Sequence, residues 1–202
     1  MNQLSTKEKI IAKSLAMFNE YGVENITTRH IAKELGISQG NLHYHYPNKN
    51  EILSTLFHNF IHQIKSAERF NGTEFDTIEM YESMLENFRI MDNYRLFFQQ
   101  NEVIWRRIPE IKNGMIQLFQ SKKNEILDLI HIYKSEGKFR QDISASQIEF
   151  LTEQFIFTIQ SWLMVKNYHP QEHSVEHYAK FLFRSWLPYL NNETMKTWEK
   201  IL

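Results

Sequence analysis

Polar and aromatic side chains are concentrated in one short stretch, "SQGNLHYHY", which lies between Gly36 and Pro47. On a helical wheel of about 100° per residue, Leu42 and Tyr46 fall on one side, with His45 beside them. The opposite side carries hydrogen-bonding groups with little formal charge, together with one glycine: Gln39, Gly40, Asn41, His43 and Tyr44. Amides pair with adenine edges, and rings contact sugars or thymine methyl groups. The pattern predicts a short helix whose outer face reads base pairs.

Basic, N–H-rich helix ends are expected on both sides of this helix. Thr27, Thr28 and Arg29 begin the preceding segment "TTRHIAKEL", and Lys49 begins the following one. The free N–H groups and the dipole at a helix N-terminus favour an anion. The absence of a side chain at Gly40 also lets the backbone come close to a partner. We expect these groups to hold phosphates beside a groove while the short helix reads inside it.

The first of the elements that position these residues begins at "STKE", where Ser5 and Glu8 can form a capping box. It ends at Gly22, which can adopt a positive φ. A later helix opens at "NKNE" and runs to about Arg69 without glycine or proline. We expect that helix to act as a rod between a head and a body.

Helical spacing of apolar residues recurs along the whole chain, and no segment shows the alternation of a strand. The spacing predicts an all-α fold of about nine or ten helices. The 202 residues allow one large domain or two small ones.

The composition is that of an ordinary globular protein, with 42% hydrophobic and 23% charged residues. Residues 1–50 carry a net charge of +2 and the remainder −3, the sign expected if the head meets a polyanion. The chain has no cysteine, no signal-peptide core and no apolar run long enough for a membrane span, so we expect a cytoplasmic protein.

The stretch "TTRHIAKELGISQGNLHYHYPNK" resembles the helix-turn-helix of the TetR family of transcriptional regulators. The resemblance implies a DNA-binding domain over residues 1–52, with the motif at about 27–46, and a helical ligand-binding and dimerisation domain over 53–202. It implies DNA contacts at Thr28, Arg29, Gln39, Gly40, Asn41, His43, Tyr44 and Lys49. His43 departs from the tyrosine that is frequent in the family. The implied partners are a double-stranded operator, a small-molecule effector and a second copy of the chain.

The segment "IEFLTEQFIFTIQSWLMV" is apolar on nearly every face, as is "HYAKFLFRSWLPYL". A helix that is apolar all round is buried all round. The resemblance implies a dimer through a four-helix bundle of these two segments, with candidate contacts at Leu151, Phe155, Ile159, Trp162, Phe181 and Trp186. The alternative is a single deep core without a partner.

Aromatic and methionine side chains of the second domain are candidates for lining an effector pocket: Met84, Phe88, Met91, Phe97, Phe98, Trp105 and Phe119. Such residues at helical spacing are more often plain core. If they line a pocket, they favour a largely apolar effector.

Three alternatives concern a metal site, an enzymatic activity and a module that binds another protein. His169, His173 and His177 have a spacing that can bind zinc, but Pro170 places the first of them at the helix cap, so we expect no metal and no cofactor. The chain has no glycine-rich phosphate loop, nucleophile elbow or H-E-x-x-H motif, so we expect no enzymatic activity. The alternative to a DNA-binding regulator is a helical module that binds another protein.

Overall fold

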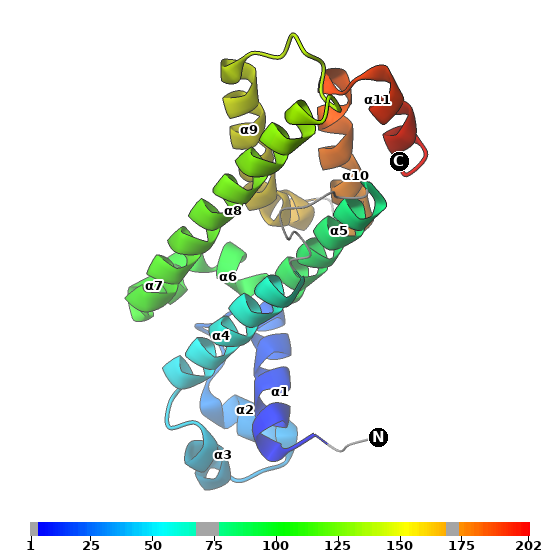
Figure 1. Ribbon diagram of the computed structural model, residues 1–202. Coiled ribbons are helices and arrows are strands. Elements are labelled where there is room, and N and C mark those ends of the chain that lie inside the picture. Colours follow the sequence, from blue (N-terminus) through cyan, green and yellow to red (C-terminus); the bar gives the residue numbers. More distant parts are fainter. Residues whose placement is uncertain (1–3, 68–76, 169–173) are drawn as a thin grey trace. The chain divides into compact units, whose positions relative to one another are not determined.

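The computed structural model describes residues 4–67, 77–168 and 174–202 (Figure 1). These residues form an all-α fold, in which the only extended pairing is an isolated bridge between Phe139 and Leu190. Their eleven α-helices exceed the expected number because residues 96–107 form two short helices. The elements are α1 (Thr6–Tyr21), α2 (Thr28–Leu35), α3 (Gln39–His45), α4 (Lys49–Ala67), α5 (Thr77–Asn93), α6 (Leu96–Gln99), α7 (Asn101–Arg107), α8 (Pro109–Ser135), α9 (Ala145–Tyr168), α10 (Val175–Trp186), the 3-10 helix η1 (Leu187–Tyr189) and α11 (Asn192–Glu199).

The chain divides into two compact units, and the division does not follow a single cut in the sequence. Unit 1 comprises residues 1–65 and 93–115, and unit 2 comprises residues 66–92 and 116–202. Unit 1 therefore contains the whole of the expected DNA-binding domain, most of α4, and the segment from the end of α5 to the start of α8. Three helices, α4, α5 and α8, pass from one unit to the other.

The predicted caps form in unit 1. Ser5 Oγ accepts from the Glu8 amide at 3.3 Å, and the Glu8 carboxylate accepts from the Ser5 amide at 2.8 Å, which completes the capping box. Gly22 ends α1 with a φ of 87°, a conformation that side chains rarely adopt. At the start of α4, Asn48 Oδ1 accepts from the Glu51 amide at 3.1 Å.

Aromatic rings fill the core of unit 1. Phe57 and Phe60 of α4 meet Phe97 of α6 with centroid separations of 5.4 and 5.9 Å, and Phe60 also meets Tyr94 at 5.6 Å. Aromatic pairs at these separations stabilise beyond their buried area. The ring contacts of Phe60 with Tyr94 and Phe97 lie within unit 1 and join α4 to the segment that follows α5.

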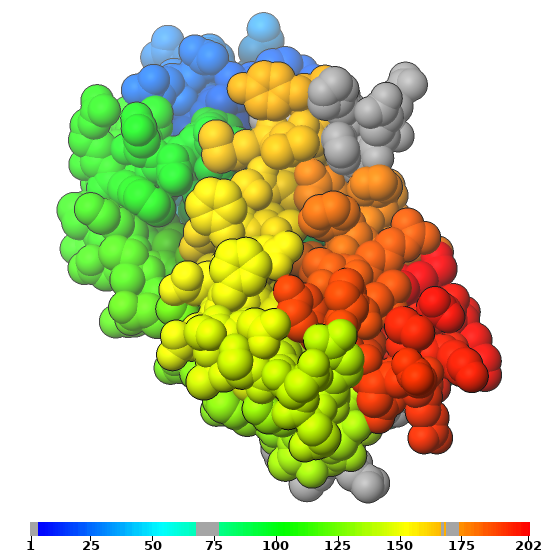
Figure 2. All heavy atoms as spheres, turned by 90° about the horizontal axis from the view of Figure 1, so that it is seen from above, coloured from blue at the N-terminus to red at the C-terminus, as the bar shows by residue number. Residues whose placement is uncertain are grey.

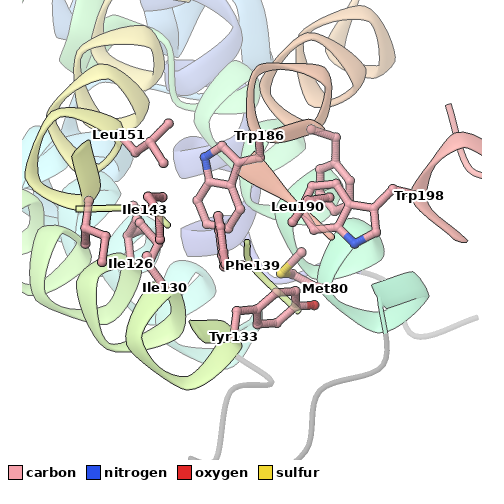
Figure 3. Packing of buried hydrophobic residues seen from close by; sticks show 12 residues of the cluster. Met80, Ile126, Ile130, Tyr133, Phe139, Ile143, Leu151, Trp186, Leu190 and Trp198 are labelled. Atoms are coloured by element: carbon pink, nitrogen blue, oxygen red, sulfur yellow. The ribbon is translucent and has the colours of Figure 1, made fainter. Parts of the chain in front are cut away.

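Unit 2 is built around two tryptophans (Figure 3). Trp186 and Trp198 stack with centroids 5.9 Å apart, and Phe139 lies 5.8 Å from Trp186. Helices α9 and α10 pack antiparallel, because Phe155 meets Trp186 at 5.5 Å while Trp162 meets Tyr178 at 5.1 Å. The isolated bridge and the hydrogen bond from Asn191 N to Lys138 O, 2.8 Å long, close the turn after α8 onto the end of η1.

Among the described residues, no helix is both long enough and apolar enough to cross a lipid bilayer.

Candidate nucleic-acid interface

Helix α3 presents a polar outer face on a buried inner face, as the wheel predicted. Leu42 is fully buried and Tyr46 is 3% exposed, whereas the Tyr44 side chain is 84% exposed. Asn41 and His43 are also exposed. Ser38 Oγ caps the helix by accepting from the Asn41 amide at 3.1 Å. The inner residues fix the helix, and the outer ones remain available to a partner.

The start of α2 lies beside α3. Thr27 caps α2 by accepting from the His30 amide at 3.2 Å, and the His30 ring accepts in return from the Thr27 amide at 3.4 Å. Gln39 Nε2 donates to Thr28 Oγ1 at 3.0 Å, which joins the first residues of the two helices. Arg29 is exposed one residue further along. The structure thus brings together Thr28 and Gln39, which the sequence placed on separate helices, with Arg29 next to Thr28 along α2.

Lys49 is held differently from the other predicted contacts. Its ammonium group donates to Val23 O at 2.6 Å and to Ile26 O at 2.9 Å, and the side chain is half-buried. Burial first, and the Arg107 guanidinium second, lower the pKa of the Lys49 ammonium, while Glu24 raises it. Lys49 therefore fastens the α1–α2 turn to the start of α4, a structural task that its sequence position does not reveal.

Two side-chain amides that sequence reasoning did not single out join α1 and the turn after it to residues 93–100. Gln100 Oε1 accepts from the Val23 amide at 2.6 Å, and Gln100 Nε2 donates to Phe18 O at 2.9 Å. Asn19 Nδ2 donates to Asn93 O at 2.7 Å, and Asn19 Oδ1 accepts from the Leu96 amide at 3.1 Å. We call these two residues the amide clamp. Their partners are backbone groups distant in sequence, so no local pattern indicates them.

The candidate dimer contacts on α9 and α10 divide into two sets. The structure corrects the prediction for Leu151, Trp162 and Trp186, which are buried inside the protomer and offer no surface to a partner. Phe155 and Ile159 are half-buried against the same core, and Phe181 is 50% exposed. The exposed apolar side chains form another set, which we call the α9–α10 stripe: Phe150, Phe157, Met164, Val165, Tyr168 and Phe181. Figure 2 shows the α9 and α10 side chains, in yellow and orange, on the surface.

The candidate pocket residues belong to different units. Phe97 and Phe98 pack in the aromatic core of unit 1, and Trp105 lies half-buried in that unit. In unit 2, Phe88 meets Trp162 edge-on at 5.2 Å, Met91 is buried, and Met84 and Phe119 are half-buried. Asn87 Oδ1 and Trp162 Nε1 are buried without a hydrogen-bond partner among the described residues.

In the residues that the structure describes, no group of three or more histidine, aspartate or glutamate side chains could hold a metal ion. His169 and His173 of the histidine series lie outside the described residues.

Two family models match the chain in succession. Residues 10–56 match the model described as "Bacterial regulatory proteins, tetR family", and residues 56–197 match the model described as "Bacterial transcriptional repressor". The first match contains α2, α3 and the start of α4, where the exposed polar face and the helix starts come together.

Relatives and solved structures agree with these matches. An HTH-type transcriptional regulator of Staphylococcus aureus (strain bovine RF122 / ET3-1) is 25% identical over 91% of this chain and 94% of its own length. A TetR-family regulator from Marinobacter aquaeolei VT8 has the same fold, with a TM-score of 0.87 over 98% of this chain and 97% of that one at 22% identity.

A more distant structure is that of SmeT, the repressor of the Stenotrophomonas maltophilia multidrug efflux pump SmeDEF. It has a TM-score of 0.67 at 16% identity, over 94% of this chain and 93% of that one. Because the two family models together span residues 10–197 and the fold and the exposed reading helix agree with them, this chain belongs to the TetR family of bacterial regulatory proteins and is a DNA-binding transcriptional regulator.

Proposed function

We propose that this protein is a cytoplasmic repressor that binds a two-fold symmetric operator as a homodimer and is released by a small, largely apolar effector. The observation that carries the DNA-reading part is the division of α3 into a buried inner face and a solvent-exposed face of Asn41, His43 and Tyr44. Helices that read the major groove use a face of this kind.

The α9–α10 stripe supports the homodimer. Phe157 is 73% exposed on α9. Phe150 precedes it by seven residues and Met164 follows it by seven, and both are exposed as well. Side chains spaced by a heptad share one face of a helix, so the three form a continuous apolar strip. Phe181 adds a ring from α10, which packs beside α9. Contiguous exposed apolar surface of this kind is uncommon on monomers and marks an interaction site. A two-fold dimer presents α3 twice, so its operator repeats.

The interior of unit 2 supports an effector that is mainly apolar with few polar groups. Phe88 and Met91 of α5 lie in a region rich in buried rings, where Trp162 Nε1 and Asn87 Oδ1 lack partners among the described residues. A buried polar group left without a partner costs about 1–3 kcal/mol. An apolar effector carrying an acceptor for the indole or a donor for the amide would remove that cost. Two structures of this fold hold small molecules. One is the complex of SmeT with triclosan, with a TM-score of 0.62, and the other is a transcriptional regulator from Saccharomonospora viridis in complex with choline, with a TM-score of 0.66.

Selection of binding sites from random DNA tests the proposal most directly. The purified wild-type protein is expected to enrich a consensus of two inverted half-sites. Enrichment of a single asymmetric site would contradict the dimeric mode, and a complete lack of enrichment would contradict sequence-specific binding.

An effector found later, for example by mass spectrometry of the purified protein, is expected to weaken binding of the selected operator by about 1–3 kcal/mol. By linkage, the operator must weaken effector binding by the same factor. An effector that leaves operator affinity unchanged would contradict release.

A further inference from the structure

The segment from α6 to the start of α8 lies outside the helix-turn-helix in sequence but is built into the same unit. Three hydrogen bonds of the amide clamp, 2.6–3.1 Å long, join this segment to α1 and the α1–α2 turn, and the fourth binds Asn93 O at the end of α5. Both amides donate and accept, so each is satisfied at both ends. Residues 96–100, which directly precede α7, are therefore held against α1 and the turn that follows it.

The start of α8 fixes the same segment on its other side. Gly114 lies directly on the ring of Phe57, where a β-carbon would come within 2.6 Å of Cε1. Gln100, which directly precedes α7, and Lys49 both bind the backbone of Val23, so the segment that carries Arg107 is fixed at the same turn as Lys49. The guanidinium of Arg107, the last residue of α7, is the second cause, after burial, that lowers the pKa of the Lys49 ammonium.

Two cationic side chains, Arg107 and Lys49, belong to this region of unit 1. Arg107 is exposed, and its side chain forms no ion pair with any residue in the described ranges. Burial first, and the Arg107 guanidinium second, lower the pKa of the Lys49 ammonium, and the Glu24 carboxylate opposes them. Lys49 retains one N–H beyond the two that its backbone partners use.

We propose that Arg107 and Lys49 together bind a backbone phosphate of DNA, so that the protein grips the duplex from α7 as well as from the helix-turn-helix. A phosphate supplies the negative charge that the two cations lack and accepts the paired N–H groups of a guanidinium. The inference rests on DNA binding by this family member. It extends the interface to a residue of the second family match, well beyond the motif at 27–46.

The salt dependence of DNA binding tests this phosphate contact. The variant is Arg107→Gln, and the probe is a duplex of random sequence, because phosphate contacts are independent of sequence. Losing one phosphate contact in each protomer should flatten the slope of log K against log salt by about 1.8. Between about 50 and 200 mM salt, the wild type should then lose about tenfold more affinity than the variant. An unchanged slope would overturn the proposal.

Two further variants separate the local effect from a change in net charge or in folding. Lys196→Gln removes a positive charge from exposed α11 in unit 2 and should leave the slope as in the wild type. Arg107→Lys keeps the charge and should keep most of the slope; a slope as flat as that of Arg107→Gln would show that the charge is not the cause. Glu24→Gln removes the opposing carboxylate and should tighten the binding of DNA. Unchanged affinity for DNA would contradict the phosphate contact of Arg107 and Lys49. If the wild type itself shows no salt-dependent binding of the duplex, the proposed DNA-binding function is contradicted, and not only the phosphate contact of Arg107 and Lys49.

Discussion

Gly114 of α8 lies so close to Phe57 of α4 that a β-carbon at residue 114 would stand 2.6 Å from Cε1 and 2.7 Å from Cζ of the ring. Glycine inside a helix costs about 1 kcal/mol relative to alanine. The close contact explains why this position nevertheless carries glycine. The ring cannot easily retreat, because Phe57 is itself packed against Phe60 and Phe97.

Gly114→Ala should therefore destabilise the protein, by about 1–3 kcal/mol, although alanine favours a helix. Urea denaturation measures the free energy of unfolding. Phe57→Leu replaces the ring by a smaller side chain. This substitution should lower the free energy of unfolding less in the Gly114→Ala background than in the wild type, because it relieves the clash. Additive effects of the two substitutions would show that the ring and the new methyl group do not meet.

Lys49→Met should destabilise unit 1 by about 1–3 kcal/mol, because Val23 O and Ile26 O lose a charged donor. Val23 and Ile26 are buried, so water replaces that donor poorly. Thermal denaturation followed by circular dichroism measures the change. The exposed Lys33→Met is the control and should change stability by less than about 0.5 kcal/mol. Equal melting temperatures for the two variants would show that the Lys49 hydrogen bonds do not stabilise the turn.

Substitution of Asn41 or His43 by alanine should relax the base preference at symmetric positions of the selected operator. A good bidentate contact contributes about 1–3 kcal/mol of discrimination, and removing it should leave non-specific binding nearly unchanged. Gln39→Ala should act at a different position and should also release Thr28, to which Gln39 donates. Competition with single-base operator variants measures each preference. A uniform loss over all sequences would assign that residue to positioning rather than reading.

Phe157→Glu should convert the dimer into folded monomers, because dimerisation would bury an unpaired carboxylate. The fold should survive, since Phe157 is 73% exposed in the protomer. Sedimentation equilibrium and circular dichroism together report assembly and folding. Gln120→Glu, which adds the same charge at an exposed position of α8, is the matched control and should remain dimeric. Persistence of the Phe157→Glu dimer would place the interface away from the α9–α10 stripe.

The sequence predicts those features that depend on neighbouring residues. The capping box of Ser5 and Glu8 and the inward placement of Leu42 and Tyr46 follow from spacings of three and four residues, and the structure confirms both. The all-α class follows in the same way, because helical periodicity is a local pattern.

Features that depend on tertiary contacts could not be predicted. Asn19 and Gln100 bind backbone groups, which every residue type supplies, so no sequence signal marks their partners. On α9, apolar residues occur on all faces, and the sequence alone does not tell which face meets the protomer's own core. The candidate dimer contacts included Leu151 and Trp162, which face inward, whereas Phe157 faces outward. The structural role of Lys49 could not be predicted either, because the backbone carbonyl that accepts from its ammonium group lies in a turn far from it in the sequence.

The amide clamp also determines where this regulator can be cut and recombined. A chimera that receives residues 1–52 from a relative keeps its own Gln100 but acquires a foreign α1. Gln100 then still finds the carbonyl of residue 18 and the amide of residue 23, because any residue except proline at position 23 provides them. Asn19, in contrast, travels with the graft, and a relative without an amide there would leave the Leu96 N–H without its acceptor. Transplanted DNA-reading heads should therefore function in this body most readily when they bring an asparagine at position 19.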